Sequence, residues 1–98
     1  MRKDLCHLTV QKPPEFLFVA VDMSKSDDAF KHGLKRLKKP FIEMYEKEHN
    51  ARLAFRKGHP SMFIVLAEVM AEDGFTFYHA ETGEWLTDEI PSKYLRLC

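Results

Sequence analysis

Cysteine is scarce in this sequence of 98 residues, and neither sign of charge is in excess. The two cysteines, Cys6 and Cys98, lie near opposite ends and form no CxxC motif. We therefore expect no disulfide framework, reduced thiols and a cytoplasmic location. The 15 basic and 15 acidic residues cancel, so no global field attracts nucleic acid or a membrane surface. Any site for a polyanion must be a local patch.

Long apolar runs are also lacking. The longest run, Met62 to Ala67, is far shorter than the roughly 20 residues of a membrane span. The charged start MRKDLCHL has no apolar segment of the kind found in secretion signals. We therefore expect no membrane association. The histidines show no metal-ligand spacing, so no metal site is expected, and no Ser/His/Asp or Cys/His constellation can be assembled.

The residues that are present indicate one folded domain over positions 1–98. Hydrophobic residues make up 45% of the chain and aromatic residues 12%, which is enough for a single modest core. Residues 1–14 are expected to form an N-terminal strand or linker, because Pro13-Pro14 holds the backbone extended. Residues 15–98 are expected to form the main lobe.

Two stretches favour helices. The first, over residues 26–33, is expected to start at Ser26 as its N-cap and to end near Gly33. The second is expected over residues 46–58, where apolar residues precede a glycine stop. The stretch AEVMAEDG, residues 67–74, is interpreted as a strand end or a short turn.

Strand patterns dominate the rest of the chain. FLFVAV, residues 16–21, is rich in β-branched and aromatic residues and predicts a strand buried on both faces. FTFYHA and EWLT flank Glu81-Thr82-Gly83, which indicates a hairpin. Further strands are predicted over 5–10, 40–45, 61–66 and 93–98. The sum is an α+β domain with about two short helices and about six strands.

A long ordered pattern runs through the C-terminal half of the chain, without a gap. Its members are Arg56, Gly58, Pro60, Ala67, Met70, Asp73, Gly74, Phe77, Tyr78, Gly83, Trp85, Leu86, Thr87, Asp88, Pro91, Tyr94 and Leu95. This pattern resembles the catalytic lobe of the NAD-dependent RNA 2′-phosphotransferases, the enzymes that remove the splice-junction 2′-phosphate from tRNA. Leu17-Phe18 and Gly33-Leu34 match that family more loosely.

The resemblance covers residues 15–98 and implies an ADP-ribosyltransferase-like fold with a split antiparallel β-sheet. It also implies a place in tRNA processing, and NAD as the cofactor if the chain is active. The family's N-terminal lobe, which contributes to the RNA phosphate site, is expected to be absent from this chain.

Two segments depart from the family's pattern. Where the family has His-Gly-Thr on its first strand, this chain has Val19-Ala20-Val21, an apolar run expected in the core. Where the family has an arginine and then Val-His-Leu-Ser, this chain has Lys39 and then Ile42-Glu43-Met44-Tyr45. Lysine lacks the planar fork that grips phosphate, and glutamate places a negative charge beside a pyrophosphate. Arg56 is retained, whereas Lys57 replaces a histidine.

Candidate site residues follow from these positions. Lys39, Glu43 and Arg56 are candidate catalytic residues, and Arg56 and Tyr78 are candidates for cofactor binding. Glu43 would stand in for the acid that other ADP-ribosyltransferases use if it points into the cleft. A basic face is a candidate contact for RNA or nucleotide phosphate, although such a run also occurs as a solvated surface. That face comprises Lys31, Lys35, Arg36, Lys38 and Lys39.

Three functions stay open at this point. The two altered segments favour a degenerate relative that binds a nucleotide, RNA or a protein without turnover. The second function is an active NAD-dependent transferase that uses Lys39, Glu43 and Arg56. The third is a structural or oligomerising module whose exposed edge strands pair with a partner chain. Packing alone also explains the matched aromatic residues, because large aromatics dominate small cores.

Overall fold

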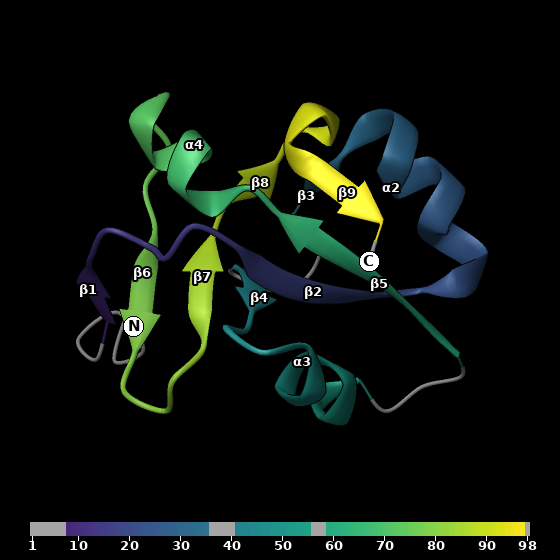
Figure 1. Cartoon of the computed structure of the whole chain (residues 1–98), viewed down its shortest axis with the longest axis horizontal. Helices are drawn as coiled ribbons and strands as arrows, with labels where there is room; N and C mark the ends of the chain where they lie inside the picture. The colour runs from purple at the N-terminus through teal and green to yellow at the C-terminus, as the bar shows by residue number, and fades with distance from the viewer. Residues whose placement is uncertain (1–7, 36–40, 56–58, 98) are drawn as a thin grey trace.

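The computed structural model describes residues 8–35, 41–55 and 59–97 (Figure 1). Cys6 and Cys98, expected to be reduced, lie outside the described residues. In chain order the elements are β1 (Leu8–Val10), β2 (Leu17–Asp22), the 3₁₀ helix η1 (Met23–Lys25), α2 (Ser26–His32), β3 (Leu34–Lys35), β4 (Ile42–Met44), α3 (Glu48–Ala54), β5 (Pro60–Val65), α4 (Ala67–Glu72), β6 (Tyr78–Ala80), β7 (Trp85–Thr87), β8 (Glu89–Ile90), the 3₁₀ helix η2 (Ser92–Tyr94) and β9 (Leu95–Leu97).

The strands form separate antiparallel sheets, so the α+β prediction with a divided sheet is confirmed. One sheet has the order β1-β6-β7-β4, a second has the order β2-β5-β9, and β3 pairs with β8. In Figure 1 the four-stranded sheet stands on the left and β2 and β5 cross to the right. The first two sheets meet at one bridge, where Phe18 and Tyr45 exchange backbone hydrogen bonds of 2.7 and 2.9 Å.

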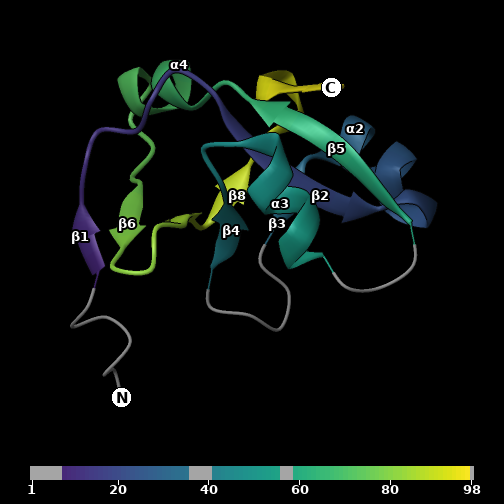
Figure 2. The same cartoon turned by 60° about the horizontal axis from the view of Figure 1, so that its bottom comes forward.

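The core lies where β2 and β5 pack against the short helices. Leu17 and Val19 on β2 stand opposite Val65 and Phe63 on β5, and all four are buried. The prediction that β2 is buried on both faces was wrong, because Phe18 and Ala20 are only half-buried. Their face is covered by α3, a two-turn helix that leaves part of the strand accessible (Figure 2).

The interpretation of residues 67–74 as a strand end or turn was also wrong. Residues 67–72 form α4, whose buried Ala67 and Met70 are one helical turn apart. Tertiary packing of this face decides the helix, because six residues are too few to be helical on their own. The expected stop was in the right place, since Gly74 follows with a positive φ of 106°.

The first helix ends as predicted but starts differently. Gly33 is the C-cap of α2, whereas Ser26 lies inside the helix and its hydroxyl donates to the Met23 carbonyl. The capping side chain lies four residues earlier, where Asp22 accepts from the Ser24 backbone N–H at 2.9 Å and starts η1. The helix-start signal is therefore an acidic residue at the end of a strand, and not the predicted Ser26.

The other predicted elements are confirmed in shorter form. The hairpin β6–β7 turns at Gly83, whose φ is 106°, and β4 and β9 lie within the expected ranges. β5 has the expected length but begins and ends one residue earlier than the predicted range 61–66. The described part of the chain holds nine strands where about six were expected, and the two-residue strands β3 and β8 leave no sequence pattern. None of the helices in that part is long and apolar enough to cross a membrane.

Candidate functional site

The two segments that depart from the family's pattern lie side by side in space. Phe18 on β2 and Tyr45, directly after β4, are the bridge partners that join the two sheets. Val19 follows Phe18 and is 6% exposed in the core cluster, as predicted for the run Val19-Ala20-Val21, whereas Ala20 and Val21 are only half-buried. Glu43, two residues before Tyr45, is exposed.

Glu43 and Tyr78 share one face of the four-stranded sheet. Both stand directly opposite Leu86 of β7, Glu43 from β4 on one side and Tyr78 from β6 on the other. Directly paired residues lie on the same face, and two strand spacings separate the two backbones by about 10 Å. The ring of Phe41 packs against Tyr78, with centroids 5.3 Å apart. The candidate acid and the candidate aromatic contact therefore line one surface.

Tyr45 belongs to the same surface, although it was not among the predicted site residues. Its hydroxyl donates to Glu43 Oε1 at 3.4 Å. Partial burial, and then the charges of Glu43 and Glu84, raise the pKa of Tyr45 to about 12. Glu43 thus lies in an acidic neighbourhood beside a hydroxyl that stays protonated at neutral pH. The i, i+2 spacing of Glu43 and Tyr45 in a strand was the available signal.

We expect Tyr45 to make the protein lose stability at alkaline pH. The folded-state pKa of Tyr45 lies above the ordinary value near 10, so the unfolded chain gives up this proton first. The stability that Tyr45 contributes is therefore complete below about pH 10 and is lost as the pH rises toward about 12. Tyr45→Phe should flatten the fall of the urea midpoint across this window. An unchanged slope in Tyr45→Phe would contradict the assignment.

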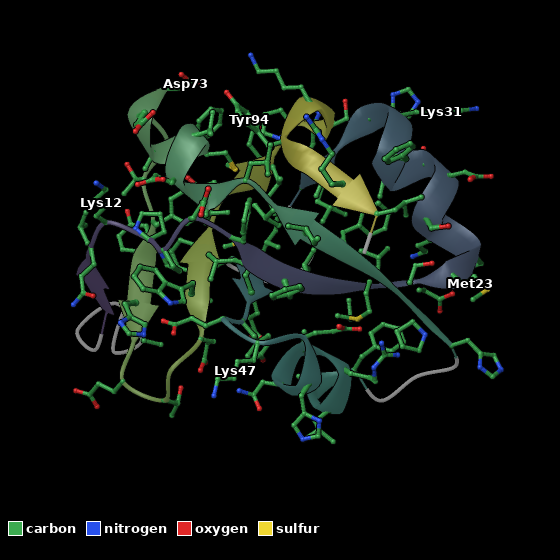
Figure 3. The ribbon with its side chains drawn as sticks, in the orientation of Figure 1. Lys12, Met23, Lys31, Lys47, Asp73 and Tyr94 are labelled. Carbon is green, nitrogen blue, oxygen red and sulfur yellow. The ribbon has the colours of Figure 1, made fainter. Side chains whose placement is uncertain are left out.

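Several residues that match the family's pattern have scaffold roles. The hydroxyl of Tyr94 donates to Asp73 Oδ2 at 2.6 Å, and this bond, followed by burial, raises the pKa of Tyr94 (Figure 3). The indole N–H of Trp85 donates to Glu46 Oε2 at 2.8 Å. The same indole stacks on the ring of His79, with centroids 4.1 Å apart. These contacts fix α4, η2 and the hairpin in place.

Only some of the other candidate residues lie in the part of the chain that the structure describes. Lys39 and Arg56 lie outside the described residues. Of the predicted basic face, Lys31 lies in the last turn of α2 and Lys35 lies on β3, so its described members belong to different elements. Within the described ranges no group of three or more His, Cys, Asp or Glu residues could hold a metal ion.

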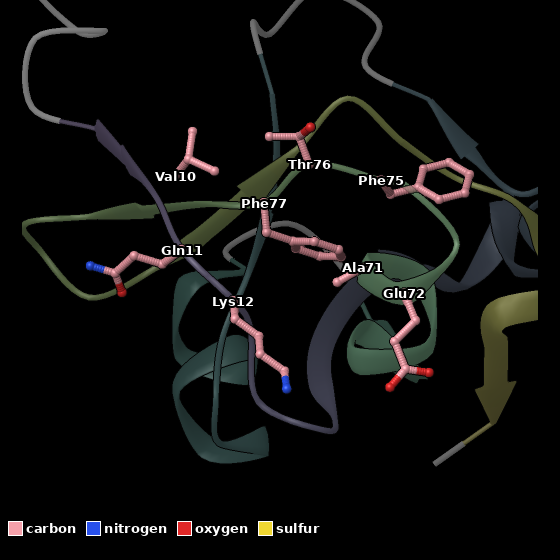
Figure 4. A pocket seen from close by; sticks show the side chains of 8 residues that line it. All are labelled: Val10, Gln11, Lys12, Ala71, Glu72, Phe75, Thr76 and Phe77. Atoms are coloured by element: carbon pink, nitrogen blue, oxygen red, sulfur yellow. The ribbon is translucent and has the colours of Figure 1, made fainter.

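A shallow hollow of about 330 Å³ lies between the segment after β1 and α4 (Figure 4). Figure 4 shows Lys12 and Glu72 on opposite sides of it. Its lining consists of Val10, Gln11, Lys12, Ala71, Glu72, Phe75, Thr76 and Phe77. None of the candidate site residues is among them, so the hollow is separate from the surface that carries Glu43 and Tyr78.

Comparison with known proteins finds relatives among the probable RNA 2′-phosphotransferases, although no family model matches the chain. A probable RNA 2′-phosphotransferase of Flavobacterium johnsoniae is 32% identical over 90 residues, which is 91% of this chain and 50% of the relative. One from Trichormus variabilis is 32% identical over 91 residues, or 92% of this chain and 50% of the relative. One from Escherichia coli is 32% identical over 84 residues, which is 85% of this chain and 46% of the relative.

The chain spans about half the length of the curated relatives it matches. The matches cover about nine-tenths of this chain. The chain is thus related to the RNA 2′-phosphotransferases, over about half of their length.

Proposed function

We propose that the chain is an RNA 2′-phosphotransferase-like domain that binds RNA or a nucleotide and does not turn over NAD. The observation that carries this proposal is the position of Val19. The resemblance puts the family's histidine at this place, on a strand where it contacts NAD. Here the side chain is 6% exposed and packs in the core cluster, and an apolar group in that place donates no hydrogen bond to a ligand.

The surroundings of Glu43 support the same proposal. Glu43 replaces the family's second histidine. The carboxylates of Glu43 and Glu84 lie close enough to Tyr45 to raise the pKa of its hydroxyl. Like charges repel, so a pyrophosphate placed beside Glu43 and Glu84 would be disfavoured. The scaffold itself is retained, with the β6–β7 hairpin, the hydrogen bond from Tyr94 to Asp73 and the glycines at its turns. Such a scaffold can still present a binding surface.

An active NAD-dependent transferase is the second candidate function. The observation that favours it is the shared face of Glu43 and Tyr78, because an acid beside an aromatic surface suits a nicotinamide nucleotide. In this alternative Glu43 and Lys39 would act in catalysis, Arg56 would bind phosphate, and Tyr78 would contact the cofactor.

The two functions differ in their response to NAD. We expect NAD at millimolar concentration to leave the melting temperature unchanged, since only a ligand that binds the folded state stabilises it. If NAD did bind, a concentration of about 100 times its Kd would add about 2.7 kcal/mol to the free energy of unfolding and would clearly raise the melting temperature. We also expect no nicotinamide release from NAD with 2′-phosphorylated RNA present.

Glu43→Gln provides the matched control for this experiment, because the change removes one charge at an exposed position and keeps the size. Nicotinamide release by the wild type that disappears in Glu43→Gln would establish the transferase and refute the proposal. A thermal shift with NAD in the wild type would refute the proposed loss of the cofactor site.

A further inference from the structure

One face of the four-stranded sheet carries aromatic rings and carboxylates together. Side chains at positions 41, 43 and 45 point to the same side of β4, because successive residues of a strand alternate between its faces. Tyr78 of β6 joins them, since Tyr78 and Glu43 both stand opposite Leu86 of β7. The register of β4 and β7, continued by one residue, places Glu84 opposite Tyr45. We call this set of side chains the aromatic–acidic face; it comprises Phe41, Glu43, Tyr45, Tyr78 and Glu84.

Two contacts and one electrostatic effect bring these groups together. The rings of Phe41 and Tyr78 have centroids 5.3 Å apart and are tilted by 48°. The Tyr45 hydroxyl donates to Glu43 Oε1 at 3.4 Å. After partial burial, the charges of Glu43 and Glu84 raise the pKa of Tyr45, so both carboxylates act on the same hydroxyl. A negative potential therefore lies beside the pair of rings.

The aromatic–acidic face is open toward β6 and β1. The helix α3 lies beside β2 and β4, whereas β6 and β1 stand clear of α3 in both views (Figures 1 and 2). Val10 on β1 stands opposite Tyr78 and is 68% exposed. Glu43 is exposed, and the three aromatic side chains are only half-buried. A partner can therefore reach both the rings and a carboxylate.

The two carboxylates have hydrogen-bond donors but no cation. Glu43 accepts from Tyr45, and Glu84 accepts from the Thr82 hydroxyl. No ion pair between residues that the structure describes includes either glutamate. Each bond engages one carboxylate oxygen, Oε1, so the other oxygen of each glutamate can accept from a ligand.

Carboxylates beside aromatic rings suit a planar cation. An arginine guanidinium stacks on an aromatic ring and donates to a carboxylate through its fork of N–H groups. Positions 41 and 43 are about 7 Å apart along the strand, so a guanidinium on the ring of Phe41 is within reach of Glu43. A phosphate would instead meet two negative charges. Charge complementarity thus favours a basic protein segment over a nucleic acid.

We propose that the aromatic–acidic face docks an arginine-bearing segment of a protein partner, with a guanidinium stacked on the Phe41–Tyr78 pair and hydrogen-bonded to Glu43. Glu84 adds attraction from the neighbouring strand. This inference goes beyond the proposed function and does not rest on it, because the ligand there is RNA or a nucleotide. The two ligands would occupy different surfaces of the chain.

Fluorescence anisotropy with a labelled peptide of alternating arginine and glycine tests the inference on the full chain. The matched probe has citrulline in place of arginine, which keeps the shape of the side chain and removes its charge. We expect the arginine peptide to bind about tenfold more tightly than the citrulline peptide. Its affinity should fall between about 50 and 500 mM salt, because salt screens exposed charges.

The double variant Glu43→Gln, Glu84→Gln should weaken binding of the arginine peptide about tenfold and remove most of its preference over the citrulline peptide. Tyr78→Leu should weaken binding about threefold and leave the salt dependence unchanged, since it removes a ring and no charge. If the double variant melts early, Glu43→Gln alone, at an exposed position, should still weaken binding about fivefold.

The control is the double variant Asp27→Asn, Glu72→Gln, which removes the same charge from exposed positions on α2 and α4. It should bind the arginine peptide as the wild type does. Equal weakening in this control would show that only the net charge of the chain matters and would overturn the inference.

Two further results would overturn it. One is equal affinity of the wild type for the arginine and citrulline peptides. The other is binding of a labelled single-stranded RNA that Tyr78→Leu weakens, which would assign the face to nucleic acid. A melting temperature that NAD leaves unchanged, together with no preference for the arginine peptide, would refute this inference and leave the proposed function intact.

Discussion

Gly33→Ala is expected to destabilise the protein by about 3 kcal/mol or more. Gly33 has φ of 80° and ψ of −174°, a backbone region that is almost exclusive to glycine. An added Cβ would also lie 2.4 Å from the Ile90 backbone oxygen. The clash is with backbone, so relief requires α2 to move away from the β8–η2 segment. Urea unfolding followed by circular dichroism measures the loss.

Gly83→Ala separates backbone strain from the clash. Gly83 also has a positive φ, 106°, but nothing lies within 4 Å of the place where its Cβ would be. This variant should lose about 1–2 kcal/mol, the ordinary cost of a left-handed backbone for an alanine. If both variants lose the same stability, close packing of α2 against η2 is not the reason for glycine at position 33.

Val19→His, which places the family's residue at this position, is expected to cost about 3 kcal/mol and to create no affinity for NAD. Val19 packs in the core cluster, which also holds Leu17 of the same strand and Phe63, its partner on β5. A larger side chain must displace its neighbours, and the imidazole N–H would be buried without a prepared partner. Thermal melting with and without NAD measures both effects.

Val10→His is the matched control, because Val10 is 68% exposed at the end of β1. The same chemical change there should alter stability by no more than about 0.5 kcal/mol. A Val19→His protein that is as stable as the wild type and melts higher in NAD would mean that a nucleotide site is still present beside β2.

Local patterns predicted the elements whose residues decide their own conformation. The β6–β7 hairpin follows from Gly83 in its turn, and the end of α2 follows from Gly33, because both need a positive φ. The helix α4 was missed because its buried Met70 fits a strand as well as a helix until the packing partner is known. Two-residue strands such as β3 exist only through their pairing with β8.

The candidate site was predictable only in part. Glu43 and Tyr78 were selected by resemblance, but their common face depends on the register of β4, β7 and β6 around Leu86. Register between strands far apart in sequence is fixed by the packed core and not by local pattern.

The joint between the two sheets explains how such a scaffold tolerates new chemistry. Phe18 and Tyr45 are joined by two hydrogen bonds between main-chain N–H and C=O groups. Every residue except proline supplies both groups, so these two hydrogen bonds do not depend on the side chains at positions 18 and 45. The neighbouring Leu17, Val19 and Met44 are buried in the core, so substitution there is constrained by packing. Exposed neighbours such as Glu43 can change without loss of the joint, so new chemistry can enter at the surface of the crossing while its buried side stays fixed.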